Sequence, residues 1–234
     1  MISLESPIKE IFNYLAIEVY DPKRGQINWG HDDKHILRML AARRAYWADI
    51  VKDEPGLVGV ELLLDLAILF HDLNRLKNLR GHGEADEKRR KNYATKLMKR
   101  FDITPSLSKR VNEIVAAQHL PDNPNEEPVL RLLRDLDKAD MGAIGIYRMA
   151  ATACDRGYGV FARARDFDPD VPAIEGDENL DSFAADICFC LEWFEKQEFA
   201  IRSNAIRQRV AHRFEFMRKF LEQLKIEHKE LNLI

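Results

Sequence analysis

The sequence has few cysteines, no apolar run of membrane length and almost no net charge, and each shortage excludes a class of protein. Among its 234 residues are three cysteines, Cys154, Cys188 and Cys190. This odd, sparse set fits neither a disulfide framework nor a zinc site, so we expect reduced core thiols in a cytoplasmic protein. The most apolar run, Glu61–Phe70, is about half as long as a bilayer crossing requires and contains Asp65. The first residues lack a basic stretch before an apolar core, so we expect no secretory signal.

The positive and negative side chains of the sequence nearly balance each other. Lys and Arg number 36 and Asp and Glu number 39, which gives a net charge of −3. Proteins that bind nucleic-acid polymers usually gain affinity by neutralising phosphates with a basic surface, so we expect no such partner. The one basic run, Lys88–Lys91, follows Glu84 at a spacing that favours pairing along a solvated helix face.

Helical periodicity covers nearly the whole chain, and no stretch alternates apolar and polar residues as a strand would. We therefore expect an all-α fold, one domain over residues 1–234, with its core motifs at about 27–165 and C-terminal helices at about 178–229 packed on it. The loop over about 166–176 is the only candidate linker. The expected helices span roughly residues 5–19, 32–51, 57–73, 84–100, 106–118, 126–136, 138–163, 179–200 and 203–229.

Histidines interrupt two of the apolar helical faces. His35 shares a stripe with Met39 on its helix. The apolar run described above leads directly into His71 and Asp72. Adjacent side chains on an ideal helix point about 100° apart, so these two can share one metal only near a helix end or bend. The pattern places them at such an end.

An aspartate interrupts a third apolar stripe. Asp137 follows Leu130 and Leu133 at helical spacing, and Ile144 continues the same spacing. Taken alone, each interruption has an ordinary explanation. His35 could be a hydrogen-bonded core histidine, and Asp137 a helix cap or the partner of a neighbouring arginine.

The four residues His35, His71, Asp72 and Asp137 are better explained together. An ionised carboxylate buried without a partner costs several kcal/mol or shifts its pKa until it is neutral. Imidazole nitrogens and carboxylate oxygens form a mixed ligand set that suits Mn, Co, Ni, Fe, Zn or Mg. We therefore expect the four side chains to meet around one divalent metal ion per chain.

In this order the four residues resemble the HD superfamily of metal-dependent phosphohydrolases, which is named for its His-Asp doublet. The family pattern is a histidine, then the doublet, then a distant aspartate. The matching stretches are residues 30–38, 66–75 and 134–145, and residues 211–221 fit the ending of the small stand-alone bacterial members. The resemblance covers about residues 27–225, and it implies an HD-type helical bundle that holds its metal with His35, His71, Asp72 and Asp137.

The resemblance also implies a reaction and the residues that serve it. The expected activity is hydrolysis of a phosphate ester or anhydride, of a nucleotide above all, by attack of a metal-bound water. His82 and His119 match positions that bind a second ion in two-metal members and contact phosphate or water in the others. Arg75 stands where some relatives place a catalytic glutamate, and we expect it to neutralise phosphate charge. The candidate substrate-binding residues are Arg38, Lys138 and Asp140.

Several alternatives remain open at this point. His82 and His119 could be ordinary surface histidines, and each candidate cation could be paired with a surface carboxylate. If both histidines add ligands, the chain could be a di-iron HD-type oxygenase. It could also bind a nucleotide without turnover. The expected partner in each phosphate-based interpretation is a phosphorylated small molecule rather than a membrane, and the apolar C-terminal helices could form a homodimer surface.

Overall fold

The computed structural model describes residues 6–21, 32–76, 79, 83–118, 120, 123, 125–157, 182–196 and 200–230. Every regular element within these ranges is a helix, which confirms the expected all-α class and its helical bundle. None of the described helices is both long and apolar enough to cross a membrane. His82, His119 and the loop expected over 166–176 lie outside the described residues.

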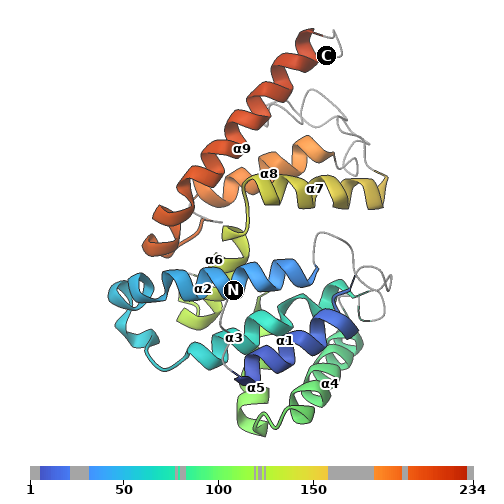
Figure 1. Ribbon diagram of the computed structural model, residues 1–234, viewed down its shortest axis with the longest axis vertical. Coiled ribbons are helices and arrows are strands. Elements are labelled where there is room, and N and C mark those ends of the chain that lie inside the picture. Colours follow the sequence, from blue (N-terminus) through green and yellow to red (C-terminus); the bar gives the residue numbers. More distant parts are fainter. Residues whose placement is uncertain are drawn as a thin grey trace. The chain divides into compact units, whose positions relative to one another are not determined.

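The first of two compact units comprises residues 1–137 and 203–205 (Figure 1). Its elements in chain order are α1 (Ser6–Glu18), α2 (Asp33–Asp53), the 3-10 turn η3 (Pro55–Leu57), α3 (Glu61–Phe70), the 3-10 turn η4 (His71–Arg75), α4 (Glu84–Arg100), α5 (Pro105–Ala117) and most of α6 (Pro128–Ala139).

Helix α3 forms the centre of this unit. All residues from Leu64 to Phe70 are buried, including Asp65. The helix packs against α1, α2 and α5, which surround it in Figure 1. Because α3 is covered on several sides, its last turn is held in place where the His-Asp doublet begins.

Two expected helices are shorter than the sequence pattern suggested, and glycine explains both differences. The helix expected over 57–73 begins only at Glu61, because Gly59 has a φ of 89°. The helix expected over 138–163 begins at Ala143, after Gly142 with a φ of 102°. Ile144 is 49% exposed on that later helix, so the expectation that it extends the stripe of Asp137 is wrong.

The second unit comprises residues 138–202 and 206–234. Its helices are α7 (Ala143–Arg156), α8 (Phe183–Glu195) and most of α9 (Asn204–Glu230). Helices α7 and α8 lie side by side (Figure 1), and α9 packs on α8 through the stacked rings of Phe194 and Phe214, whose centroids are 4.7 Å apart. The boundaries between the units do not fall in the expected linker, and the single domain stays a prediction.

The cysteines differ in exposure. Cys190 is buried and Cys188 is half-buried on α8, but Cys154 is exposed near the end of α7. The expectation of three core thiols is therefore wrong for Cys154.

Candidate metal centre

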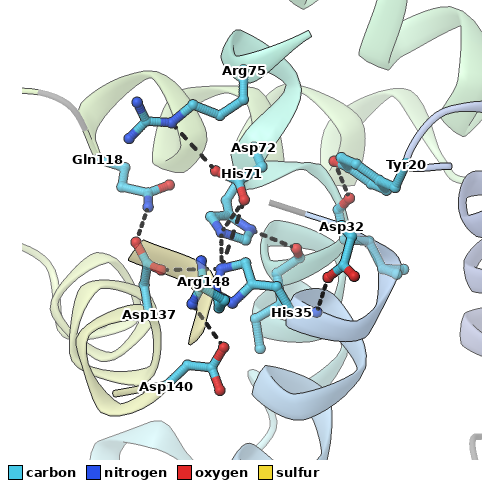
Figure 2. Close-up of polar contacts among 12 residues, drawn as sticks. Tyr20, Asp32, His35, His71, Asp72, Arg75, Gln118, Asp137, Asp140 and Arg148 are labelled. Atoms are coloured by element: carbon cyan, nitrogen blue, oxygen red, sulfur yellow. Dashed lines mark hydrogen bonds and ion pairs between the residues drawn. The ribbon is translucent and has the colours of Figure 1, made fainter. Parts of the chain in front are cut away.

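The first turn of α2 places His35. Asp32 precedes the helix in extended conformation, and its carboxylate Oδ1 accepts a hydrogen bond from the backbone N–H of His35 at 3.0 Å. This N-cap satisfies a backbone donor that the helix itself leaves unpaired. The His35 side chain is completely buried, and its Nε2 atom points toward the end of α3 (Figure 2).

The change from α-helix to 3-10 turn places His71 and Asp72. Helix α3 ends at Phe70, and the tighter η4 turn brings both side chains of the doublet toward His35. The Nδ1 atom of His71 lies 2.8 Å from the backbone oxygen of Ile68. Because a carbonyl oxygen can only accept, Nδ1 carries the hydrogen, and Nε2 of the neutral ring presents a lone pair. Histidine ligands of metal ions commonly donate their other ring N–H in this way.

Tyr20 supports the doublet from the N-terminal segment. Its hydroxyl donates to the backbone oxygen of Leu69 at 2.9 Å, two residues before the doublet. Burial, together with the negative charges of Asp72 and Tyr93, raises the pKa of Tyr20 well above its usual range. Tyr20 therefore remains a protonated donor at any physiological pH.

Helix α6 supplies Asp137, and its two oxygens have different neighbours. Oδ1 lies 3.2 Å from Nε2 of His35. Oδ2 accepts a hydrogen bond from the side-chain amide of Gln118 at 3.4 Å. The amide thus fixes the orientation of the carboxylate, and one oxygen remains directed at the histidines (Figure 2).

Three of the four predicted ligands converge. His35, His71 and Asp137 form a group able to hold a metal ion, because one ligand atom from each lies within 4.8 Å of the others. The two Nε2 atoms are 3.3 Å apart. Asp72 is not part of this group, although its Oδ2 lies 3.4 Å from Nε2 of His71 and 3.7 Å from Nε2 of His35, and its role as the fourth ligand stays a prediction.

These separations fit a shared divalent cation. Nitrogen and oxygen ligands lie about 2.0–2.2 Å from such ions, so neighbouring ligand atoms are about 3.0 Å apart at right angles and about 3.4 Å apart in a tetrahedron. The observed separations of 3.2, 3.3, 3.4 and 3.7 Å fall around these values. Two imidazoles and the carboxylate of Asp137 face one point, with Asp72 beside them, and such ligands match the chemistry of Mn, Fe, Co, Ni or Zn.

Electrostatics keep Asp137 ionised. Its side chain is 36% exposed. Burial raises the pKa of this carboxyl group, but the hydrogen bond with His35 and the positive charge that His35 and His71 carry when protonated outweigh burial. The net result is a pKa well below the usual range of aspartate. An ionised carboxylate is the form that binds a metal ion.

A buried ion pair joins the two helices that carry the histidines. Arg43 of α2 donates from Nε to Oδ1 of Asp65 on α3 at 2.6 Å and from Nη2 to Oδ2. The same guanidinium lies 5.7 Å from the ring centroid of Trp47, whose Nε1 donates to Glu61 at 2.9 Å. A bidentate pair has a fixed geometry, so this network sets the register of α2 against α3.

A cavity of about 790 Å³ adjoins the doublet within the first unit. The cavity is lined by Phe70, which directly precedes the doublet in the sequence, and by Leu73 and Arg75, which follow it. Arg75 lies next to the doublet as well as the cavity, because its Nε is 3.8 Å from Oδ1 of Asp72. The cavity is within the range of roughly 300–1,000 Å³ that small-molecule sites occupy.

The lining of this cavity carries one more positive than negative side chain. Arg75 is joined there by Arg90 and Lys91 of α4, and the acidic lining residues are Glu87 and Glu113. The charge of Glu113 is balanced by Arg110 at 3.1 Å and by Lys109 at 3.9 Å. A ligand that carries negative charge is therefore favoured.

The remaining predicted site residues differ in the residues around them and in their exposure. Arg75 lies beside the cluster, whereas Arg38 and Lys138 are half-buried on α2 and α6. Asp140 is 6% exposed in the second unit and pairs with Arg148 at 2.8 Å. The substrate-binding roles of Arg38, Lys138 and Asp140 stay predictions, as do the roles of His82 and His119.

Four contributing residues were missed by the sequence analysis. Tyr20 and Gln118 contact the site from distant segments and gave no local signal. Arg90 and Lys91 were assigned to a solvated face with Lys88, although Lys91 lies one helical turn before the buried Ala94. Lys91 is exposed, as that face predicts, and Arg90 is half-buried, yet both line the cavity.

No protein-family model and no curated protein matches the chain. Solved structures do match it. YpgQ from Bacillus subtilis, solved in complex with ADP, has a TM-score of 0.62 at 19% identity, with 94% of this chain and 97% of that chain covered. A protein from Lactobacillus plantarum has a TM-score of 0.63 at 20% identity, covering 98% of this chain and 100% of the other.

The Lin1889 protein from Listeria innocua is a third structural neighbour. Its TM-score is 0.60 at 16% identity, and 97% of each chain is covered. Likenesses at such low identities show that the chain shares the fold of these proteins over nearly its whole length.

Proposed function

We propose that this protein is a divalent-metal-dependent phosphohydrolase of the HD type, which cleaves a phosphate ester or anhydride of a nucleotide. The observation that carries the proposal is the convergence of His35, His71 and Asp137, with Asp72 next to them, beside a cavity whose lining includes three cations. The sequence resemblance and the ADP bound to YpgQ, a protein of similar fold, support the nucleotide as substrate.

The four ligands would hold the cation by two ring nitrogens and two carboxylate oxygens. When bound, a divalent ion lowers the pKa of a water molecule and polarises a phosphoryl oxygen. The ring of His71 is oriented for this task by its Nδ1–H bond to Ile68, and Asp137 is oriented by Gln118. Ligands held in this way need little reorganisation when the cation binds.

Arg75 connects the ligand cluster to the cavity. Its guanidinium can donate two parallel hydrogen bonds to phosphate oxygens. From its position beside Asp72 it would neutralise charge on the phosphoryl group during attack by water. The bond from the water oxygen to phosphorus forms as the bond to the leaving oxygen breaks, and the leaving oxygen takes up a proton.

The cavity would accept the remainder of the substrate. Lys91 and Arg90 provide positive charge on the α4 side, and Arg90 is held by a hydrogen bond from Nη1 to the backbone oxygen of Leu79 at 3.2 Å. Val115, Ala116 and Ala117 of α5 also line the cavity and are only half-buried, so they would offer apolar surface to a flat base.

A nucleotide panel tests this proposal. Nucleoside mono-, di- and triphosphates are incubated with the protein and Mn²⁺, Co²⁺, Ni²⁺ or Mg²⁺, and 31P NMR distinguishes phosphate from pyrophosphate release. We expect hydrolysis that stops with EDTA and falls at least about 1,000-fold in Asp72→Asn. The control Asp53→Asn changes an exposed carboxylate at the end of α2 and should leave the rate unchanged. A metal-loaded protein that hydrolyses none of these compounds, or that carries two irons, would overturn the proposal.

A further inference from the structure

Gln118 presents a buried acceptor atom at the candidate metal centre. Its amide nitrogen donates to Oδ2 of Asp137, but its amide oxygen Oε1 is buried and accepts no hydrogen bond from the described residues. A buried acceptor left without a donor costs about 1–3 kcal/mol, so such atoms usually serve a water or a ligand.

The orientation of this amide follows from its neighbour. A flipped amide would bring Oε1 against the carboxylate of Asp137, and two acceptors would then face each other. The arrangement in which nitrogen contacts Asp137 is the one that makes a hydrogen bond. Oε1 is therefore the atom that remains for another partner.

The backbone on both sides of Gln118 is anchored to α6. The Nη2 atom of buried Arg134 donates to the backbone oxygens of Ala117 and Leu120, both at 2.7 Å. Its Nη1 atom donates to Glu126 at 2.8 Å. Because these bonds bracket Gln118, the amide is held in position before any ligand binds, which is the property expected of a residue that orients a reactant.

The amide oxygen is directed into the site. In Figure 2 it is turned away from Asp137 and toward the side on which Asp72 and Arg75 lie. Asp72 offers only acceptor oxygens in its ionised form. A small molecule with hydrogen-bond donors suits the space near these acceptors, and water is the reactant of the proposed hydrolysis.

We propose that Gln118 is a catalytic residue whose amide oxygen accepts a hydrogen bond from the attacking water and turns a lone pair of that water toward phosphorus. The chemical role rests on the proposed function. An amide oxygen is not basic enough to take the proton, so Gln118 orients the water only. The proton lost as the oxygen–phosphorus bond forms ends on the leaving oxygen as its bond to phosphorus breaks.

The variant Gln118→Met tests this role, because it keeps the side-chain length and removes both polar atoms. We expect kcat at saturating Mn²⁺ to fall about 30-fold, whereas KM changes less than about threefold. The lost hydrogen bond to Asp137 also weakens Mn²⁺ binding, so kcat is compared with each variant saturated by the ion. The control Gln223→Met removes an exposed glutamine that likewise donates to a carboxylate, that of Glu227 at 2.8 Å, and should change none of these. A kcat that returns to the wild-type value at saturating Mn²⁺ would overturn the proposal, because Gln118 would then act only by holding Asp137.

The variant Gln118→Glu distinguishes the acceptor role of the side chain from its donor role. A glutamate still offers an acceptor oxygen to water but cannot donate to Asp137. We expect Gln118→Glu to retain several-fold more activity than Gln118→Met. The reverse order would mean that the donor bond to Asp137 is what matters, and the proposal would fail.

A high-resolution crystal structure of the metal-free protein gives a readout that does not depend on turnover. We expect a water within about 3.2 Å of Gln118 Oε1 that is absent in Gln118→Met. A wild-type structure without that water overturns the proposal whatever the activity. If the water is present but no nucleotide is hydrolysed, the proposed function fails instead, and with it the catalytic role of the residue.

Discussion

Nε2 of His35 and Nε2 of His71 lie 3.3 Å apart in a place where neither side chain reaches solvent. The hydrogen of His71 is on Nδ1, so its Nε2 faces the other ring with a lone pair. Two carboxylates approach the same point. A cation in that position would bind the two ring nitrogens and an oxygen of Asp137, which form the group able to hold a metal ion.

The first prediction concerns the acid stability of the metal-free protein. The pKa of Asp137 is lowered in the folded state, so this carboxyl group stabilises the fold fully above the ordinary pKa of about 3.9. The contribution is lost as pH falls toward the lowered pKa. Thermal unfolding in EDTA between pH 7 and pH 3 should therefore show a steeper loss of Tm for the wild type than for Asp137→Asn. Parallel Tm curves for the two proteins would contradict this expectation.

A second prediction concerns the ion pair between α2 and α3. The side chains of Arg43 and Asp65 are 10% and 5% exposed, so Asp65→Leu leaves a buried guanidinium without its partner. We expect the free energy of unfolding in urea to fall by about 3–5 kcal/mol, and the double change with Arg43→Met to recover most of that loss.

An exposed ion pair provides the control for that experiment. Arg218 and Glu195 lie 2.7 Å apart with more than a third of each side chain exposed. Arg218→Ala should cost less than about 1 kcal/mol. If Asp65→Leu costs no more than Arg218→Ala, the buried pair does not set the register of the two helices.

A third prediction, which rests on the proposed function, concerns the cavity. Lys91 lines it from α4, whereas Lys88 is exposed on the same helix and is not part of the lining. A charged hydrogen bond to phosphate contributes about 1.5–3 kcal/mol, less when solvent screens it. Lys91→Ala should therefore raise the nucleotide KM about five- to tenfold, and Lys88→Ala should leave it unchanged. Equal KM values for the two variants would show that substrate does not reach α4.

The candidate metal ligands could be picked out of the sequence because each one breaks a local pattern. His35 and Asp137 lie on apolar helical stripes, and His71 and Asp72 end the most apolar run of the chain. Helical periodicity depends only on neighbours a few residues away, so it can be recognised in the sequence without knowledge of the fold. A helix end or bend at His71 was expected from the need of two adjacent side chains to share one ion, and the structure has a 3-10 turn there.

The supporting residues were not predictable in the same way. Tyr20 finds its acceptor at Leu69, 49 residues away, and Gln118 finds Asp137 19 residues away. Such contacts exist only once the helices have packed, and a tyrosine or glutamine near a helix end is unremarkable in sequence. The breaks at Gly59 and Gly142 were visible as glycines, but only the backbone shows that both require a positive φ.

Titration of the metal-free protein with Mn²⁺ by calorimetry tests the central claim most directly. We predict one site per chain in the wild type, a Kd at least about 100-fold weaker in His71→Ala, and no change in His212→Ala, which removes an exposed histidine on α9. A wild-type protein that binds no Mn²⁺, or a Kd that is the same in His71→Ala, would contradict the assignment of His35, His71, Asp72 and Asp137 as metal ligands.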